Sequence, residues 1–185
     1  MRRPVQFEPA SPAGGTAVTK LGGQPVWLQA PQWPLSTALA EPMMFIGQFR
    51  LDADDAVRMA YVFMSDDDDG GVDGTWEPEG GENAVIIQPD GRLPPFVTVR
   101  SLHEGPSWPA EDHLPVDDRT AGDDDAWEFL DGEPVWLQGD ESPGPGWRLV
   151  GQLTDRLGYN FGDAGIGYIF VSPDGHEGRF LWQCA

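Results

Sequence analysis

Hydrophobic positions in this chain fall in short runs that are separated by glycine, proline and acidic residues. Such runs cover residues 43–51, 61–64, 84–88 and 168–171. Each is too short for an ordinary globular helix and is rich in aromatic or β-branched residues, so each predicts a strand. The first run is apolar on both faces and is interrupted at Gly47, which predicts a doubly buried strand with a bulge at that glycine.

Three shorter segments carry weaker patterns. Residues 26–28 follow a Gly-Gly pair and a proline, and they predict a strand with Trp27 turned inward. Residues 96–99 follow two prolines, which places them at the edge of a sheet, where a missing backbone N–H is harmless. Residues 52–58 predict one helical turn, because acidic residues at its start suit the helix dipole.

The chain also repeats itself. Residues 21–29 nearly recur as residues 130–138. The other matches, in the same order, are 44–49 with 148–153, 60–65 with 167–172 and, more weakly, 84–88 with 179–183. Self-similarity of this kind usually marks a unit that buries its apolar face against its copy. We therefore predict an internal duplication with a pseudo-twofold relation.

Composition supports the same fold class. The 185 residues include 24 Gly and 18 Pro, too many for long helices, while 39% hydrophobic residues are too many for disorder. The predicted fold is mainly β, with two pseudosymmetric duplicated β units packed into one compact domain and few short helices. We expect an extended or partly disordered arm at 1–19, a first repeat unit at 20–100, an acidic, proline-rich surface connection at 101–125 and a second repeat unit at 126–185.

Four residues occupy equivalent places in the two repeats: Trp27 and Trp136, and Gln48 and Gln152. The tryptophans are interpreted as symmetric core anchors. The two glutamines have two readings. They are either a symmetric ligand site or buried amides that satisfy backbone groups, and the second reading is favoured because buried polar side chains usually bond to backbone.

The formal net charge of −20 argues against binding to nucleic acid or to anionic membranes, because both carry negative charge. A basic protein is the physical converse, and general acidity of the host's proteins is the plain alternative. The candidate residues for meeting a basic partner are Asp66, Asp67, Asp68, Asp69, Asp123, Asp124 and Asp125.

Cysteine content and hydropathy indicate a cytoplasmic, soluble chain. Cys184 is the single cysteine and cannot form an internal disulfide; it is predicted to be a small buried apolar residue. The first residues, 1–4, are not followed by an apolar run, so no secretory signal is predicted. No window of about 18 apolar residues could span a bilayer.

No metal or cofactor is predicted. The acidic run that begins at Asp66 lacks calcium-loop spacing. His103, His113, His176 and Cys184 are not at zinc-ligand spacing, although the first two share the acidic connection. The glycines of residues 162–167 precede a strand, whereas a dinucleotide motif needs glycines between a strand and a helix.

No catalytic residue is assigned either. The chain has no Gly-x-Ser-x-Gly elbow for a nucleophilic serine. Its eight tryptophans and many carboxylates do suit a carbohydrate enzyme or lectin, in which rings stack on sugars and carboxylates cut.

In these motifs the chain resembles the YwqG-like family of bacterial proteins, a domain of unknown function. The resemblance rests on residues 20–25, 45–48, 162–170 and 180–184. It implies a largely β, internally duplicated fold without an established enzyme activity. A remoter resemblance, through the Gly-Gly-x-Pro-x-Trp-Leu pattern, is to the programmed cell death protein 2 family of ribosomal-protein chaperones. That family has cysteine-rich zinc modules, which this chain lacks.

Two hypotheses follow. The first is a cytoplasmic, non-enzymatic protein-binding module, chaperone-like or immunity-like, whose acidic loops meet a basic protein. The second is a binder or hydrolase of a small molecule or glycan that uses tryptophan and carboxylate side chains in a cleft between the halves.

Overall fold

The computed structural model describes residues 1–10, 15–53, 56–66, 71–120 and 126–185, and these are built almost entirely from β-strands, as predicted. The strands are β1 (Arg3–Pro9), β2 (Lys20–Leu21), β3 (Trp33–Leu35), β4 (Met44–Ala53), β5 (Ala56–Met64), β6 (Asn83–Gln88), β7 (Thr98–Arg100), β8 (His113–Asp117), β9 (Phe129–Leu130), β10 (Arg148–Thr154), β11 (Ile166–Val171) and β12 (Gly178–Gln183). In these ranges the helical structure is limited to a 3-10 turn, η1 (Asp155–Leu157), so no helix has the length and apolar character needed to cross a membrane.

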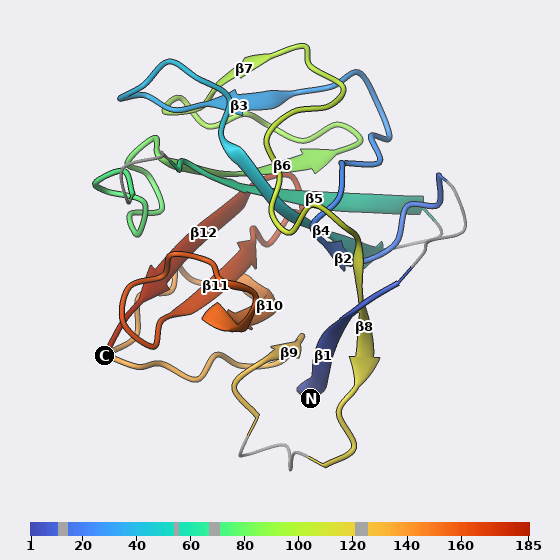
Figure 1. The fold of residues 1–185 in the computed structure, drawn as a ribbon, viewed down its shortest axis with the longest axis vertical. Coiled ribbons are helices and arrows are strands. Elements are labelled where there is room, and N and C mark those ends of the chain that lie inside the picture. Colours follow the sequence, from blue (N-terminus) through green and yellow to red (C-terminus); the bar gives the residue numbers. More distant parts are fainter. Residues whose placement is uncertain (11–14, 54–55, 67–70, 121–125) are drawn as a thin grey trace.

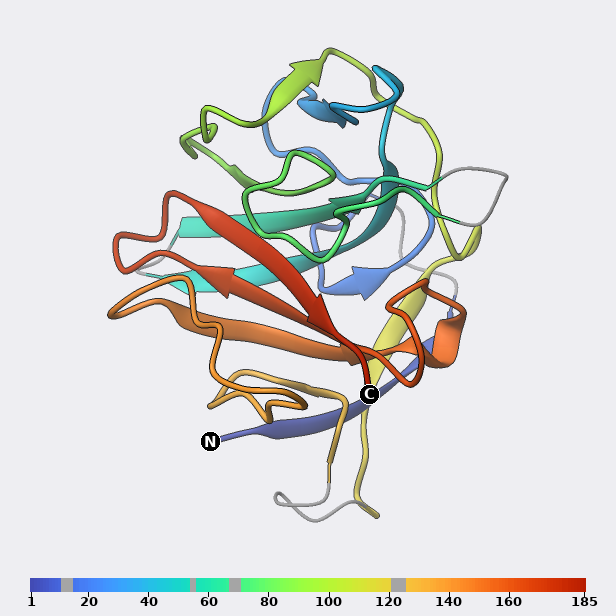
Figure 2. The same ribbon diagram turned by 90° about the vertical axis from the view of Figure 1, so that its left-hand side faces the viewer.

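Ten strands form one sheet in the order β12-β11-β10-β9-β1-β8-β2-β4-β5-β6, and β3 and β7 form a separate pair. The large sheet curves until its edge strands, β6 and β12, pack on each other, so it is nearly a closed barrel (Figure 1). The approach is close: a Cβ atom on Gly178 of β12 would lie 2.3 Å from Val85 of β6. Figure 2 shows β4 and β5 lying above β10, β11 and β12.

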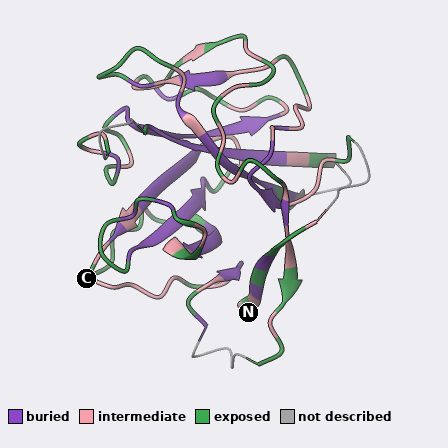
Figure 3. Cartoon of the chain, viewed as in Figure 1, coloured by how far each residue is buried: buried purple, intermediate pink, exposed green. Residues whose placement is uncertain are grey.

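Each central strand is buried on both faces because its two faces meet different cores. In β5, Ala60 and Val62 join the core enclosed by the curved sheet, whereas Tyr61 and Phe63 join an outer core of the first unit. The central strands are accordingly buried along most of their length in Figure 3. The second unit has its own outer core, so the molecule has three apolar layers, one shared and two separate.

The bulge predicted at Gly47 is confirmed. The register of β4 against β5 shifts between Phe45 and Gly47. A Cβ atom on Gly47 would lie 2.6 Å from the carbonyl oxygen of Lys20, so β2 can approach β4 only because this residue is glycine. The register of β10 against β11 shifts at the matching place, between Leu149 and Gly151.

The strand predicted at residues 26–28 does not form. Residues 25–29, which we call the first strap, have no regular secondary structure, because side chains take the place of a neighbouring strand. Gln48 Oε1 accepts a hydrogen bond from Val26 N (2.8 Å), and the Tyr61 hydroxyl donates to Val26 O (2.7 Å). The ring of Trp27 lies over Tyr61, with 4.7 Å between ring centroids.

Residues 134–138, the second strap, are held in the same way. Gln152 Oε1 accepts from Val135 N (2.9 Å), and the Tyr168 hydroxyl donates to Val135 O (3.0 Å). Trp136 lies over Tyr168, with 4.6 Å between ring centroids. The interplanar angles of the two ring pairs, 36° and 35°, also agree.

A second glutamine fastens the far end of each strap. Gln88 Oε1 accepts from two consecutive backbone N–H groups of the first strap (3.2 and 3.0 Å), and Gln183 Oε1 accepts from two of the second strap (both 3.0 Å). The amide nitrogens donate to the carbonyl oxygens of Ala30 and Gly139 respectively. These matched contacts support the duplication, which stays a prediction about ancestry.

The helical turn predicted at residues 52–58 is wrong. β4 continues to Ala53 and β5 starts at Ala56, and the two strands pair as one long antiparallel hairpin. Strand pairing on both sides of this short acidic segment therefore overrides its local helical pattern.

Two segments expected at the periphery take part in the large sheet. The arm contributes β1, which pairs with β8 and β9, and the connection contributes β8, which pairs with β1 and with Leu21 of β2. The connection is therefore more than a surface loop, because β1 and β8 lie between the strands of the two units.

Candidate functional site

Only part of the predicted acidic surface falls within the described residues. Asp67, Asp68, Asp69, Asp123, Asp124 and Asp125 lie outside them. Asp66 is described: it is exposed, follows β5 directly and lines the largest cleft found in the described part of the chain.

This cleft has a volume of about 650 Å³ and lies where the first unit, the connection and the second unit meet. Its walls come from the chain before and at the start of β4, the end of β5, the connection, and the loop after η1. It is lined by Glu41, Pro42, Met44, Met64, Asp66, Pro106, Ser107, Trp108, Gly158 and Asn160.

Backbone pairing fixes the wall that the connection supplies. Phe45 N donates to Pro106 O (2.8 Å), and Trp108 N donates to Phe45 O (3.1 Å). These bonds form an isolated parallel bridge between Phe45 and Ser107. The connection is thereby held beside β4, and Trp108 stands at the mouth of the cleft.

Trp108 presents a fixed aromatic surface. Its side chain is 47% exposed, and its indole N–H donates to Leu157 O at 2.7 Å. A tryptophan whose polar atom is already bonded keeps its apolar face for a ligand and loses little conformational entropy on binding. This residue therefore combines exposure with a defined orientation.

The rest of the cleft supplies adaptable apolar surface and negative charge. Met44 and Met64 are opposed across the β4–β5 hairpin. Methionine side chains adjust their shape readily to a binding partner. Glu41 and Asp66 are both exposed and add carboxylates at the rim. An aromatic face beside carboxylates attracts cations, above all guanidinium and ammonium groups.

Several of the chain's cations are used in internal ion pairs. Lys20 is 3% exposed and pairs with Asp112, while Arg92, Arg156 and Arg179 pair with nearby carboxylates. Because 31 acidic residues face 11 basic ones, such pairing leaves a large excess of negative charge. The field around the cleft is therefore set mainly by carboxylates.

The four repeat anchors are part of the straps. Gln48 and Gln152 are fully buried, and both ends of each amide bind backbone groups: the Nε2 atoms donate to Val18 O and Trp127 O. Trp27 and Trp136 are partly buried against the outer cores. The structure thus places all four at fastenings of the backbone and away from the cleft.

The residues considered for metal binding are dispersed. His103 is exposed, and the buried His113 donates from Nδ1 to Glu111 O. His176 lies beside Arg58, and Cys184 is half-buried, so the prediction that Cys184 is buried was wrong. No group of three or more metal-ligating side chains occurs within the described ranges.

Trp108 and Met44 were missed by sequence reasoning. Trp108 stands between Pro106 and Pro109 in a polar, acidic connection, which is an unusual place for a large aromatic residue. That context was the available signal. The cleft itself joins segments far apart in the sequence, so no local pattern could have announced it.

Comparisons with known proteins return no match: no family model, no curated protein and no solved structure is similar enough to this chain to be reported. The resemblances to the YwqG-like and programmed cell death protein 2 families therefore stay predictions.

Proposed function

We propose that this chain is a cytoplasmic, non-enzymatic protein-binding module that receives a basic segment of its partner in the cleft at Trp108. The observation that carries the proposal is a half-exposed tryptophan, fixed through its indole N–H, beside two methionines and two carboxylates in a chain of net charge −20.

The chemistry of the cleft suits an arginine or lysine side chain. A cation over a tryptophan face gains about 0.5–2 kcal/mol, depending on how far water is excluded. Glu41 and Asp66 can add charge-assisted hydrogen bonds. Met44 and Met64 can pack against the aliphatic part of either side chain. The net charge would speed the encounter more than it would deepen the affinity.

The test uses the full chain and fluorescently labelled basic peptides, with fluorescence anisotropy measured at low and at physiological ionic strength. We expect arginine-rich and lysine-rich peptides to bind, acidic peptides of the same length not to bind, and affinity to fall as salt rises. Trp108→Ala should weaken binding about tenfold. Glu41→Gln combined with Asp66→Asn should weaken it and flatten the salt dependence.

Trp127→Ala is the matched control, because Trp127 is 45% exposed, close to the 47% of Trp108, but lies outside this cleft. It should leave peptide binding unchanged. The proposal fails if no basic peptide binds at low salt, or if Trp108→Ala and Trp127→Ala weaken binding equally.

The second hypothesis, a glycan or small-molecule binder in a cleft between the halves, makes a different prediction for the same variants. Neutral sugars would then bind in a manner that Trp108→Ala abolishes, with little dependence on salt. Peptide and sugar titrations of the same protein therefore separate the two hypotheses.

A further inference from the structure

A second, smaller cavity of about 200 Å³ lies at the other end of the connection, next to β1. It opens because β9 has only two residues and pairs with β1 only at Arg3 and Pro4. Beyond that point, side chains fill the space where strand pairing stops. Arg156 reaches in from η1 and donates to Phe7 O of β1 at 3.3 Å.

The walls of this cavity carry a continuous chain of polar contacts. Gln6 Nε2 donates to Asp118 Oδ2 (2.9 Å), and Gln6 Oε1 accepts from Arg156 Nη1 (3.3 Å). Arg156 Nη2 donates to Glu128 Oε2 (3.1 Å), and Glu128 Oε1 accepts from Thr154 Oγ1 (3.3 Å). Four planar side chains thus line one small space and hold one another in position.

Glu128 is the most enclosed member of the network. Its side chain is 9% exposed. Burial raises the pKa of its carboxyl above the ordinary value, and the charge of Arg156 opposes that shift. A carboxyl group so placed stays fixed while retaining acceptor capacity on Oε2, whose partner among the described residues is Arg156.

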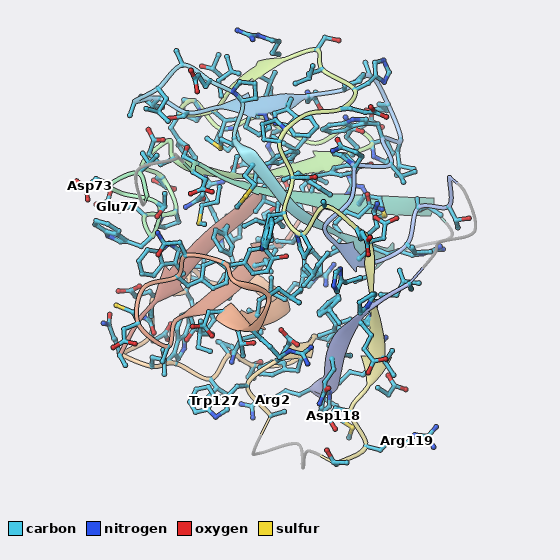
Figure 4. The ribbon with its side chains drawn as sticks, in the orientation of Figure 1. Arg2, Asp73, Glu77, Asp118, Arg119 and Trp127 are labelled. Carbon is cyan, nitrogen blue, oxygen red and sulfur yellow. The ribbon has the colours of Figure 1, made fainter. Side chains whose placement is uncertain are left out.

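Trp127 completes the cavity with an apolar wall. Its side chain is 45% exposed, and its carbonyl oxygen accepts from the buried Gln152, which fixes the backbone. Figure 4 shows Trp127 and Asp118 at the same end of the molecule, near the N-terminus. An exposed ring therefore stands beside a set of polar groups that other contacts already orient.

We propose that this cavity binds one neutral pyranose ring, with Trp127 against an apolar face of the sugar and Gln6, Asp118, Glu128 and Arg156 bonding to its hydroxyl groups. Planar carboxylate, amide and guanidinium groups each present paired polar atoms, which match pairs of neighbouring hydroxyls. Hydroxyls both donate and accept, so a sugar can join the network without displacing its members.

The charges of the cavity select a neutral ligand. Asp118 and Glu128 carry two negative charges against the single positive charge of Arg156, in a chain that is strongly acidic overall. An anionic ligand is repelled by this field, and a cation meets the guanidinium. A neutral polyhydroxyl compound meets neither obstacle.

The test is titration of the full chain with neutral methyl glycosides of glucose, galactose, mannose and N-acetylglucosamine and with short oligomers of these sugars. Binding is followed through the tryptophan indole N–H resonances in nitrogen-15 correlation spectra. We expect at least one sugar to shift the Trp127 resonance in a saturable way, with a millimolar dissociation constant. The simple glycosides and the oligomers separate recognition of a single ring from recognition of a longer glycan.

Trp127→Ala should raise the dissociation constant about tenfold or more, and Gln6→Ala should raise it several-fold. Both positions are at the surface, so the spectra of the variants should show a folded protein. Trp108→Ala should leave sugar binding unchanged. Methyl glucuronide should bind more weakly than methyl glucoside, because it adds a carboxylate.

The inference is overturned if no member of the panel shifts the Trp127 resonance, or if Trp127→Ala leaves the dissociation constant unchanged. Loss of sugar binding in Trp108→Ala, with retention in Trp127→Ala, would also overturn it, because it would move the sugar to the other cleft. Since peptide binding is expected to respond to Trp108 alone, failure here is distinguishable from failure of the proposed function.

Discussion

The two units fasten their straps with the same hydrogen bonds but differ in what covers them. In the first unit, the β3–β7 pair lies outside the strap and contributes the fully buried Trp33 to the outer core. In the described part of the second unit no strand pair takes this place, and Trp147 packs at the outer core instead. The fastening and its cover are therefore separate features.

Tyrosine electrostatics reflect this difference. Burial raises the pKa of both strap-binding tyrosines above the ordinary value of about 10. The pKa of Tyr168 is raised to about 12, and that of Tyr61 is raised further. The same hydroxyl-to-backbone contact thus lies in a drier place in the first unit, where the extra layer excludes water.

The strongest test of the shared fastening is to replace Gln48 or Gln152 by leucine, which has a similar shape but no amide. Each change leaves a buried N–H and a buried C=O of the backbone without a partner. We expect a loss of about 2–4 kcal/mol in the free energy of unfolding for either variant. Urea denaturation at neutral pH measures this loss.

The two losses should agree within about 1 kcal/mol, because the contacts have equal lengths within 0.2 Å. A variant that loses almost nothing would show that the contact in that unit is not a fastening. Matched surface substitutions, Gln29→Leu and Gln138→Leu, serve as controls, since both glutamines are exposed.

Tyr61→Phe and Tyr168→Phe remove one hydroxyl from each strap. We expect each to cost about 1–2 kcal/mol, with the larger loss for Tyr61, because its bond to Val26 O is shorter and drier. Urea denaturation again measures the loss. A larger loss in Tyr168→Phe would contradict the idea that the β3–β7 cover strengthens the contact.

The smallest expected effect is spectroscopic. The folded pKa of each strap tyrosine lies above its unfolded value, so the unfolded state loses these protons first as pH rises. Stability is therefore unaffected by these groups below about pH 10 and falls above it. Ultraviolet difference spectra should show no tyrosinate in the folded chain at about pH 10, where the urea-unfolded chain is half ionised.

As pH rises further, Tyr168 should ionise before Tyr61, and Tyr168→Phe should remove the earliest tyrosinate signal. Tyr159 does not interfere, because burial and then the charge of Glu128 raise its pKa as well. Earlier ionisation of Tyr61 would reverse the comparison between the units.

Local patterns predicted the strands that lie within the apolar runs. Residues 43–51 became β4, and the glycine that interrupts them became a bulge, because a bulge needs a residue that tolerates close backbone approach. The same reasoning failed for residues 26–28. Their apolar character is real, but it serves packing against Tyr61 and Phe63 rather than pairing with a strand.

The candidate site was only partly visible in the sequence. Asp66 was identified from charge and does line the larger cleft, while Trp108 and Met44 were not identified. Charge is a property of composition and can be read directly. A cleft depends on which distant segments become neighbours, and that information is not local.

The sequence by itself determined the alternation of core positions in β5, the glycine at the bulge, the acidic charge and the repeated order of motifs. Only the tertiary structure decided that the straps are irregular and that β1 and β8 join the two units. The physical reason is distance along the chain. The groups that satisfy the first strap come from residues 22 to 60 positions away, so its conformation is settled by buried side chains and not by its own residues.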